Sequence, residues 1–528
     1  MVKKIASTKV GDDNSLRDYR VFCSFILSMV KSMLWPAQLY TAVQSRTLDA
    51  RATATGVSAY SLMSSAGLSA FNILLRQWAL PNHIHVVCGV GNNGGDGLVL
   101  AKLARQRELA VSVYLCGDKN KLTAEAAQAL AEAEQVGVLI KPFSADDPLT
   151  DGVIVDALLG IGLNGQVRGQ VASAIAWMNQ AGLPILALDI PSGLCADTGC
   201  IMGDAVVADM TISFIAAKRG LFTGEGASVS GQVLLDDLAV PASIFDGIGE
   251  TIKHHALKTL LGRFPRRPRN AHKGLFGHVL IIGGDYGMAG AAVLAAEAAA
   301  RAGAGLVSVA TRPEHVCAML ARAPEIMVHG VASGQALDPL LVAPSIIVIG
   351  PGLGLTPWSE QILQKALASN KPLVIDADAL NLLSKILVRD KSKRDNWVLT
   401  PHPGEAARLL RTSTEVINQD RFKAVVDLQK RFGGVVVLKG AGSLVRTENE
   451  TSLCSYGNPG MSSGGMGDLL SGIIGSLLAQ HLPATTAVPL AVSLHAKAAD
   501  KAAESFGERG LLATDLLMPM RYLLNGKN

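Results

Sequence analysis

The sequence predicts an α/β protein made of two doubly wound domains, and three observations support this. Short apolar segments alternate with helical segments along most of the chain, and several of these segments run directly into glycine-rich turns. The pattern occurs twice, on either side of a stretch rich in arginine and proline. Buried parallel strands are short and apolar, and tight turns connect them to helices, so the pattern favours two parallel sheets, each covered by helices.

The composition agrees with this fold class. A chain of 528 residues is too long for a single hydrophobic core, and 49% hydrophobic against 17% charged residues is typical of a globular protein. Aromatic residues make up only 5%, while there are 54 glycines. Small residues are common in α/β proteins because βα turns are tight and helices pack closely on the sheet.

Several functional classes are not indicated. The net charge of +4 gives no reason to expect a nucleic-acid partner, and no apolar run is long enough to cross a membrane. The seven cysteines contain no Cys-x-x-Cys pair, which favours a reducing, cytoplasmic compartment without zinc or disulfides. Residues 1–32 are interpreted as an N-terminal extension outside the fold; the apolar segment 21–30 weakly resembles a signal peptide, but its serines and Lys31 argue against that.

The first domain is predicted to span residues 33–250. Its N-terminal part, 38–76, has a helical pattern, and a strand at 85–88 then leads into the glycine-rich stretch 89–97 and a helix at 98–106. Further strands are expected at 111–115, 153–155, 185–188 and 211–214, with helices at 124–134 and 171–179 between them. This alternation favours a parallel sheet.

Residues 251–273 are interpreted as a linker and the entry to the second domain. Four arginines and two prolines between 263 and 269 disfavour both a helix and a buried strand. The second domain, 274–528, begins with a strand at 279–282 and an alanine-rich helix at 289–302. Later strands are expected at 306–310, 346–349, 373–375 and 435–438, and helices at 405–410, 420–431, 469–479 and 487–503.

The strongest chemical signal is the stretch from Gly464 to Asp468. Its three glycines leave backbone N–H groups open, and the apolar run 469–478 predicts a helix whose positive N-terminus faces them, which makes a cradle for an anion. Asp468, at the mouth of the cradle, is well placed to take a proton from an attacking hydroxyl. The stretch therefore indicates phosphoryl transfer from a nucleotide to a hydroxyl; alternatively, the glycines only pack a helix against the sheet.

Other candidate residues directly follow the predicted strands of the second domain. Ligands of α/β sheets bind at the carboxyl ends of the strands, where residues 350–354, 376–381, 400–405 and 439–443 are expected. Lys439 offers a cation and Ser443 a hydroxyl, beside glycines with open N–H groups. These features favour a nucleotide site.

The residues of both domains resemble those of known enzyme families. The second domain resembles the ribokinase-like superfamily through residues Gly464 to Asp468. It resembles the ADP-dependent NAD(P)H-hydrate dehydratases more closely, through residues 272–274, 283–285, 350–354, 376–381, 400–405 and 439–443. The first domain resembles the NAD(P)H-hydrate epimerases through 89–97, 155–162 and 189–193. The likeness covers about residues 34–524. The epimerase-like domain precedes the dehydratase-like domain, as in the bifunctional NAD(P)H-hydrate repair enzymes.

The resemblance implies a reaction for the second domain. Asp468 would deprotonate the C6 hydroxyl of the S form of hydrated NADH or NADPH, ADP would phosphorylate it, and loss of phosphate would restore NAD(P)H and leave AMP. The nucleotide would be held by Lys439, Gly440, Ala441, Gly442, Ser443 and Gly467, and the hydrate would face Ala291, Gly352, His402 and Asp468. For His402, which lies between two prolines, a structural role carries equal weight.

For the first domain the resemblance implies epimerisation of the R and S hydrates. The implied dinucleotide-binding residues are Asn92, Asn93, Gly94, Gly95, Asp96, Gly160, Ile161, Gly162, Leu163, Asn164, Gly165, Gln166 and Asp189. Asn93, Asp156 and Ser192 match the potassium ligands of the family. Asp156 and Asp189, each at the end of a strand, are the candidate acid/base groups, and Lys218 is a weaker one. Capping of the following helix is the alternative role for the two aspartates.

The expected ligands are therefore K⁺ at the first site, ADP as co-substrate of the second, and the two hydrates, with Mg²⁺ as a further candidate. We also expect a homo-oligomer. An ATP-dependent kinase of a hydroxymethyl pyrimidine or sugar alcohol is an alternative, but it leaves the first domain unexplained. A non-catalytic nucleotide-binding first domain is another alternative, although Asn93 and Asp156 are both present.

Overall fold

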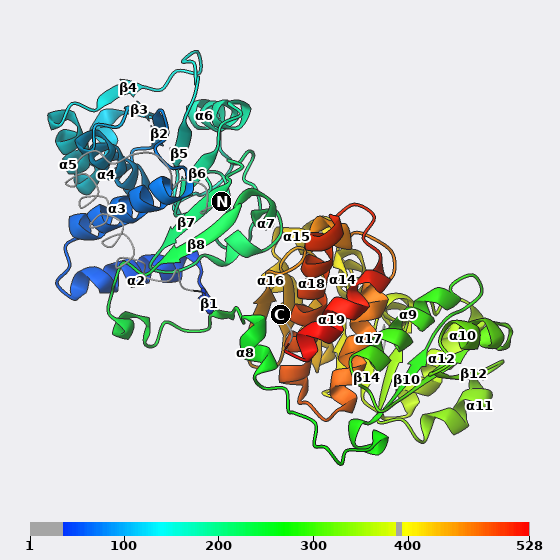
Figure 1. The fold of residues 1–528 in the computed structure, drawn as a ribbon. Coiled ribbons are helices and arrows are strands. Elements are labelled where there is room, and N and C mark those ends of the chain that lie inside the picture. The colour runs from blue at the N-terminus through cyan, green and yellow to red at the C-terminus, as the bar shows by residue number, and fades with distance from the viewer. Residues whose placement is uncertain (1–34, 387–392, 527–528) are drawn as a thin grey trace, which may run out of the picture.

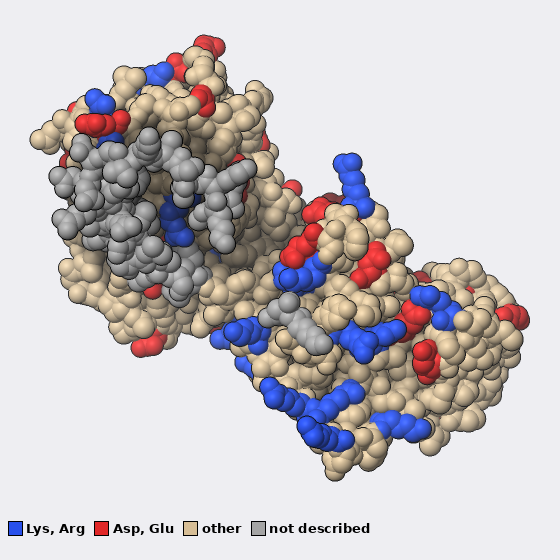
Figure 2. All heavy atoms as spheres, in the orientation of Figure 1, with Lys and Arg blue, Asp and Glu red and all other residues tan. Residues whose placement is uncertain are grey.

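The computed structural model describes residues 35–386 and 393–526, which form two α/β units (Figure 1). Each unit has its own, mostly parallel sheet with helices on both faces, so the predicted fold class is confirmed. The expected N-terminal extension, residues 1–32, lies outside the described residues. No helix in the described ranges is both long and apolar enough to cross a membrane. Figure 2 shows basic and acidic side chains interspersed over most of the face in view, with several Lys and Arg side chains gathered along the lower edge of the second unit.

The first unit contains a seven-stranded sheet, all of whose neighbours are parallel, in the order β4-β3-β2-β5-β6-β7-β8. Its strands are β2 (Ile84–Cys88), β3 (Val111–Leu115), β4 (Leu139–Pro142), β5 (Val153–Ala157), β6 (Ile185–Leu188), β7 (Met210–Phe214) and β8 (Gln232–Asp236). The winding direction reverses between β2 and β5. Such a reversal opens a crevice at the carboxyl ends of the two strands, which is where ligands of doubly wound sheets bind.

The two edge strands of this sheet, β4 and β8, were not predicted. Neither contains a fully buried residue, and β4 includes Lys141 and Pro142. Lys141 and Pro142 give β4 the polar, proline-containing sequence that is common at a sheet edge, whereas β8 does contain an apolar run, 233–235, between Gln232 and Asp236.

The helices of the first unit are α2 (Ala42–Ala54), α3 (Ala59–Gln77), α4 (Asn92–Gln106), α5 (Ala124–Gln135), α6 (Gly169–Gln180) and α7 (Gly226–Val229). Helix α4 begins at Asn92, earlier than the predicted residue 98, so the glycine-rich stretch forms its first turns. A Cβ on Gly94 would lie 2.0 Å from the Gly89 oxygen, and one on Gly97 would lie 2.5 Å from the Ala157 Cβ. These glycines therefore let the helix start directly against β2 and β5.

The second sheet has eleven strands in the order β1-β9-β18-β17-β16-β15-β14-β13-β10-β11-β12. They are β1 (Gln38–Leu39), β9 (Ile252–Lys253), β10 (His278–Ile282), β11 (Leu306–Thr311), β12 (Met327–Gly330), β13 (Ile346–Ile349), β14 (Leu373–Ile375), β15 (Trp397–Leu399), β16 (Val435–Leu438), β17 (Ser443–Arg446) and β18 (Thr451–Cys454). The strands from β16 to β12 are parallel, whereas β17 is antiparallel to both its neighbours.

The helices of the second unit are α8 (Leu257–Leu261), α9 (Ala289–Arg301), α10 (Val316–Arg322), α11 (Gly334–Leu337), α12 (Pro357–Ala368), α13 (Ala377–Ile386), α14 (Pro403–Leu410), α15 (Thr414–Gln419), α16 (Arg421–Phe432), α17 (Met466–Ala479), α18 (Ala484–Phe506) and α19 (Leu517–Leu524). Most of α17 is buried, and it packs against the alanine-rich α9. A Cβ on Gly472 would lie 2.0 Å from the Ala295 oxygen, so the two helices approach to backbone contact.

The junction between the units is built from two segments far apart in the sequence. Strand β1, which precedes the first unit, pairs antiparallel with β9, which follows it, and both extend the second sheet. Trp35 stacks on His254 with ring centroids 4.5 Å apart and donates a hydrogen bond to its carbonyl oxygen. Part of the predicted linker thus forms strand β9 and helix α8.

Candidate active sites

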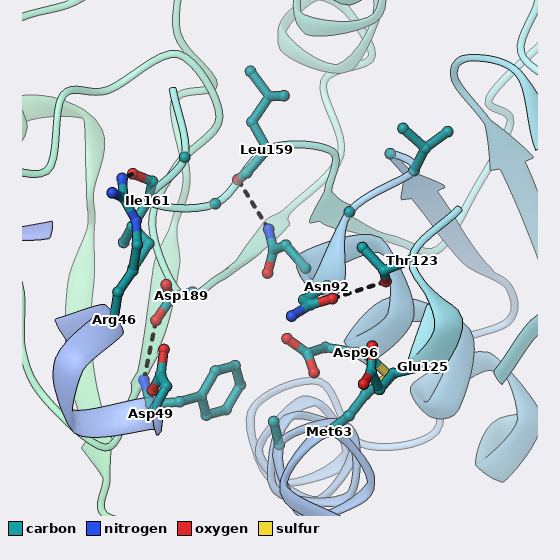
Figure 3. Close-up of a pocket in the computed structure, with 18 of the residues that line it drawn as sticks. Arg46, Asp49, Met63, Asn92, Asp96, Thr123, Glu125, Leu159, Ile161 and Asp189 are labelled. Atoms are coloured by element: carbon teal, nitrogen blue, oxygen red, sulfur yellow. Dashed lines mark hydrogen bonds between the residues drawn. The ribbon is translucent and has the colours of Figure 1, made fainter. Parts of the chain in front are cut away.

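A cavity of about 860 Å³ lies in the first unit at the carboxyl ends of β2 and β5, where the winding reverses (Figure 3). Many of the predicted dinucleotide-binding residues line it: Asn92, Asn93, Asp96, Gly160, Ile161, Gly162, Leu163, Asn164 and Asp189. Gly94, Gly95, Gly165 and Gln166 belong to the same stretches but are not among the lining residues. Lys218 also lines the cavity, which therefore brings together the ends of β2, β5, β6 and β7.

Of the three predicted potassium ligands, Asn93 lines this cavity, and Asp156 and Ser192 lie behind its wall. Asp156 is fully buried, and its carboxylate accepts hydrogen bonds from the Ser192 hydroxyl at 2.6 Å and the Ser192 N–H at 2.8 Å. Asn93 donates through Nδ2 to the Leu159 oxygen at 2.9 Å, and the Leu159 N–H donates to Ser192 Oγ at 2.8 Å. The Oδ1 atom of Asn93 is buried and has no hydrogen-bond partner among the described residues. A buried unpaired oxygen is costly unless a donor or a cation satisfies it.

Asp156 itself does not line the cavity. Burial raises the pKa of its carboxyl to about 6, although the hydrogen bonds from Ser192 oppose this shift. The carboxylate is therefore placed to fix Ser192 and, through the Ser192 hydroxyl, the backbone of Leu159, rather than to meet a ligand in the cavity directly.

The cavity wall carries a cluster of three carboxylates and one ammonium group. Asp189 pairs with Lys218, whose ammonium also donates to Ser213 Oγ at 3.1 Å and is almost completely buried. Burial, followed by the charges of Asp189 and Asp49, raises the pKa of Asp96 well above its usual value. Burial likewise raises the pKa of Asp49 to about 6. Three carboxylates face one cation here, which favours the retention of a proton on one of them near neutral pH.

Asp49 lines the cavity although no local pattern in the sequence marks it. It lies on α2 and lines the cavity opposite α4 (Figure 3). Helical periodicity identifies Leu48 as a core residue but does not distinguish a neighbouring aspartate that faces a cavity from one that faces solvent. Arg46, one turn earlier on the same helix, donates to the Ile161 oxygen at 3.1 Å and connects α2 to the loop after β5.

The second candidate site surrounds the N-terminus of α17. Gly465 has a φ of 89° and caps this helix without a side-chain hydrogen bond, so the first N–H groups of α17 are open to a ligand. A Cβ on Gly467 would lie 3.3 Å from Lys439 Nζ and 3.6 Å from Asp376 Oδ2. The first turn of α17, with Asp468 in it, thus lies against the strand ends of β14 and β16.

Lys439 is not a free cation in this structure. Its ammonium lies 2.7 Å from Asp376 Oδ1 and 3.9 Å from Glu405 Oε2, and the other Asp376 oxygen accepts from Ser471 Oγ at 2.6 Å. Burial acts against the charge of Lys439, but Asp376 and Glu405 outweigh it and raise its pKa. Lys439 therefore neutralises two buried carboxylates as well as lying beside the anion cradle.

Asp468 has the electrostatics of a general base. Burial, reinforced by the charge of Asp376, raises its pKa to about 6, while Lys439 opposes the shift. A carboxylate with a pKa near the working pH accepts a proton more effectively than one with the usual value near 4.

The residues predicted to face the hydrate lie around this helix end. Gly352 has a φ of 56°, and a Cβ there would lie 3.1 Å from the Ala291 Cβ, so the two positions are in contact. His402 caps α14, because its Nδ1 accepts from the N–H groups of Gly404 at 3.0 Å and Glu405 at 3.4 Å. Burial and the charge of Lys439 lower its pKa. The neutral ring thus carries its proton on Nε2, and half of the side chain stays exposed.

The remaining predicted nucleotide residues form the loop 439–443 between β16 and β17, called here the nucleotide loop. Gly440 and Gly442 have φ angles of 135° and 64°, which residues with a side chain rarely adopt. Ser443 donates through its hydroxyl to the Gly440 oxygen at 2.9 Å. Among the described residues, the N–H groups of Gly440 and Gly442 donate no hydrogen bond within the protein. They are therefore available to an anionic ligand.

Comparisons with known proteins find relatives of both units. Residues 279–520 match the family model for NAD(P)H-hydrate dehydratase, and residues 59–220 match that for the YjeF-related protein N-terminus. The chain is 49% identical to the bifunctional NAD(P)H-hydrate repair enzyme Nnr of Coxiella burnetii, over 92% of this chain and 99% of the relative. It is 43% identical to the enzyme of the same name from Escherichia coli, over 89% of this chain and 90% of the relative.

Among solved structures, the ADP/ATP-dependent NAD(P)H-hydrate dehydratase from Bacillus subtilis, co-crystallised with ATP and Mg²⁺, covers 52% of this chain and 99% of its own, at 26% identity and a TM-score of 0.47. The two relatives described above match nearly the whole chain, across both units and both candidate sites. The chain therefore belongs to the family of bifunctional NAD(P)H-hydrate repair enzymes.

Proposed function

We propose that the two sites catalyse two consecutive reactions on hydrated nicotinamide dinucleotides. The first site interconverts the R and S hydrates of NADH and NADPH, and the second converts the S hydrate back to NAD(P)H with ADP as phosphoryl donor. The observation that carries the second assignment is Asp468, a carboxylate with a raised pKa in the first turn of a helix whose N-terminus has no side-chain cap.

In the dehydratase site, the C6 hydroxyl of the hydrate is a poor leaving group and must be activated. Asp468 takes its proton while the hydroxyl oxygen attacks the terminal phosphorus of ADP, and the bond between that phosphorus and the bridging oxygen breaks to release AMP. Phosphate then leaves from C6, helped by the lone pair of the ring nitrogen, and loss of a proton from the neighbouring ring carbon restores the dihydropyridine. Open N–H groups between Gly464 and Gly467 stabilise the charge on the phosphoryl group.

The nucleotide and the hydrate approach Asp468 from two sides in this proposal. The nucleotide loop and Gly467 hold ADP, and the open N–H groups of Gly440 and Gly442 support this placement. Ala291, Gly352 and His402 face the hydrate, and the contact between the first two supports a shared wall. Mg²⁺ would enter as the counter-ion of the nucleotide phosphates.

The donor set in the first unit fits a potassium ion. Asn93 Oδ1 lacks a partner, and Asp156 and Ser192 add hard oxygen atoms of the kind that an alkali cation prefers. K⁺ held by these three residues would supply positive charge beside the dinucleotide phosphates. We assign Asp156 to this role because it is fully buried and does not line the cavity.

We assign proton transfer during epimerisation to the carboxylates on the cavity wall. Asp189, held in an ion pair by Lys218, accepts a proton, while Asp96, whose pKa is raised, donates one. Asp49 faces the same space and helps to keep that proton in the cluster. Asn92 at the start of α4 binds the dinucleotide through its amide and the helix N-terminus.

We further propose that the protein acts in the cytoplasm as a homo-oligomer. The cysteines at 88, 116, 195, 200, 317 and 454 are all free, which supports a reducing compartment. Light scattering on the purified chain measures the oligomeric state.

The function is tested by giving the purified protein a mixture of R and S hydrates with ADP, and then with ATP. Reappearance of the dihydronicotinamide absorbance together with AMP and phosphate supports the proposal. Accumulation of a stable phosphorylated product would instead identify a small-molecule kinase. Comparing the rates with the two nucleotides decides which one is the phosphoryl donor.

A further inference from the structure

The backbone carbonyls of the nucleotide loop are held by residues of the first unit. Thr223 is completely buried, and its hydroxyl lies 3.3 Å from the Ala441 oxygen and 3.3 Å from the Gly442 oxygen. The N–H of Gly224 donates to the same Ala441 oxygen at 3.1 Å. A Cβ on Gly442 would lie 2.0 Å from the Phe222 oxygen, so the contact between the units is close enough to require glycine.

A buried arginine joins this contact to the loop from the other side. Arg421, at the start of α16, is 3% exposed, and burial lowers its pKa to about 10, so it remains charged at neutral pH. Its Nε donates to Thr223 Oγ at 3.2 Å, and its Nη2 lies 3.2 Å from the Lys439 oxygen and 3.5 Å from the Gly442 oxygen. Within the described ranges Arg421 forms no ion pair with a carboxylate, so these oxygens are what satisfy its buried charge.

These contacts set the direction of the open N–H groups. In a trans peptide the C=O of one residue and the N–H of the next point in opposite directions. Because the carbonyls of Lys439 and Ala441 point toward Arg421, Thr223 and Gly224, the N–H groups of Gly440 and Gly442 point away from them. Two glycines with positive φ do not hold such an arrangement unaided, since glycine has the largest conformational freedom of any residue.

We propose that Thr223, a residue of the epimerase domain, is a positioning residue for ADP binding in the dehydratase domain. Its hydroxyl accepts from Arg421 and donates to the nucleotide loop, so it preorganises the N–H groups that meet the nucleotide phosphates. The proposal rests on the assignment of the loop to ADP made above. It implies that the dehydratase site of this chain is complete only when the epimerase domain is docked.

The test uses the full-length protein with the S hydrate and varied ADP. Thr223→Val keeps the shape of the side chain but removes the hydroxyl, which leaves Arg421 Nε without an acceptor. We expect the KM for ADP to rise by about tenfold while kcat changes by less than about twofold, since the loop binds the nucleotide and Asp468 performs the chemistry. Thr223→Ser restores the hydroxyl and should restore the KM.

Thr251→Val is the matched control. Thr251 is also buried at the junction of the units, where its hydroxyl donates to Gln38 Oε1 at 2.8 Å, but no contact of its side chain with the nucleotide loop is found in the described structure. This variant should keep the wild-type KM for ADP. An equal rise in KM for both valine variants would show a general loosening of the junction and overturn the proposal.

A crystal structure of the wild-type protein with ADP distinguishes the role of Thr223 from the assignment of the nucleotide loop to ADP. ADP bound on the nucleotide loop, combined with an unchanged KM in Thr223→Val, would refute the role of Thr223 alone. ADP bound away from residues 439–443 would refute the loop assignment and the role of Thr223 together. A higher KM in Thr223→Val, restored in Thr223→Ser, with ADP on the loop supports both.

Discussion

Replacing Asp468 with asparagine removes the proposed base while keeping the size and shape of the side chain. The substitution leaves the open N–H groups of α17 and the ion pair of Lys439 with Asp376 in place. General-base catalysis by a positioned side chain contributes about 10² to 10⁴ in rate. We therefore expect the kcat for dehydration of the S hydrate to fall by about this factor.

The raised pKa of Asp468 also predicts how strongly kcat/KM of the wild-type enzyme should depend on pH. With a pKa of about 6, roughly nine-tenths of Asp468 side chains are ionised at pH 7 and roughly one-tenth at pH 5. The ionised form is the base, so kcat/KM of the wild-type enzyme should fall by about tenfold over this range. A carboxyl with the usual pKa near 4 would remain about nine-tenths ionised at pH 5 and would produce almost no decrease.

The assay follows the dihydronicotinamide absorbance after S hydrate and saturating ADP are mixed with enzyme at a series of pH values. Asp468→Asn provides the control, because its residual activity should show no inflection near pH 6. Epimerisation, followed separately by exchange between the R and S hydrates, should be unaffected at pH 7, since Asp468 lies in the other unit.

An Asp468→Asn variant that keeps more than about a tenth of the wild-type kcat would refute the role of Asp468 as the base. A variant that retained the inflection near pH 6 would refute it as well, because the titrating group would then be a different residue. Loss of both activities would contradict two independent sites.

Three other changes test other parts of the structure. Asp189→Asn should abolish recovery of the R hydrate but leave the S hydrate fully recoverable, as measured on separated epimers; rapid recovery of both would remove Asp189 from the acid/base role. Asn93→Ala should raise the K⁺ concentration for half-maximal epimerisation by about tenfold, since one oxygen ligand is lost, and a K⁺ response identical to wild type would argue against this site. Gly472→Ala places a Cβ 2.0 Å from the Ala295 oxygen and should lower the free energy of unfolding by about 2 kcal/mol or more, whereas Gly290→Ala, which meets nothing within 4 Å, should not lower it in the same denaturant titration.

Much of the fold was predictable because it depends on local patterns. The central strands β13 and β16 are continuous apolar runs, and β2 and β5 are apolar except for His85 and Asp156, a composition that marks strands buried on both faces. The edge strand β4 was not predicted, since its residues are partly exposed and include a lysine and a proline, and the short interior strand β15 was not predicted either. The start of α4 was misplaced because its glycines also fit a turn, and only the closeness of Gly89 and Ala157 shows that they serve helix packing.

The residues of the candidate sites also divide into those that a local sequence pattern marks and those that it does not. Asp156, Asp189 and Asp468 were identified because each is adjacent to a strand end or a glycine-rich turn. Asp49 lies in the middle of an ordinary helix, and Arg421 at the start of another, so neither has a local signal. Their roles arise from residues more than a hundred positions away in the first case and from the other unit in the second.

The sequence by itself determined the fold class, the order of the two units and the chemistry available at their strand ends, because apolar period, glycine placement and side-chain type are local properties. Only the tertiary structure decided that Lys439 neutralises Asp376, that Asp156 lies beneath the cavity rather than in it, and that Thr223 contacts the nucleotide loop. Charge pairing and burial depend on which distant segments meet, and that information appears only when the chain is folded.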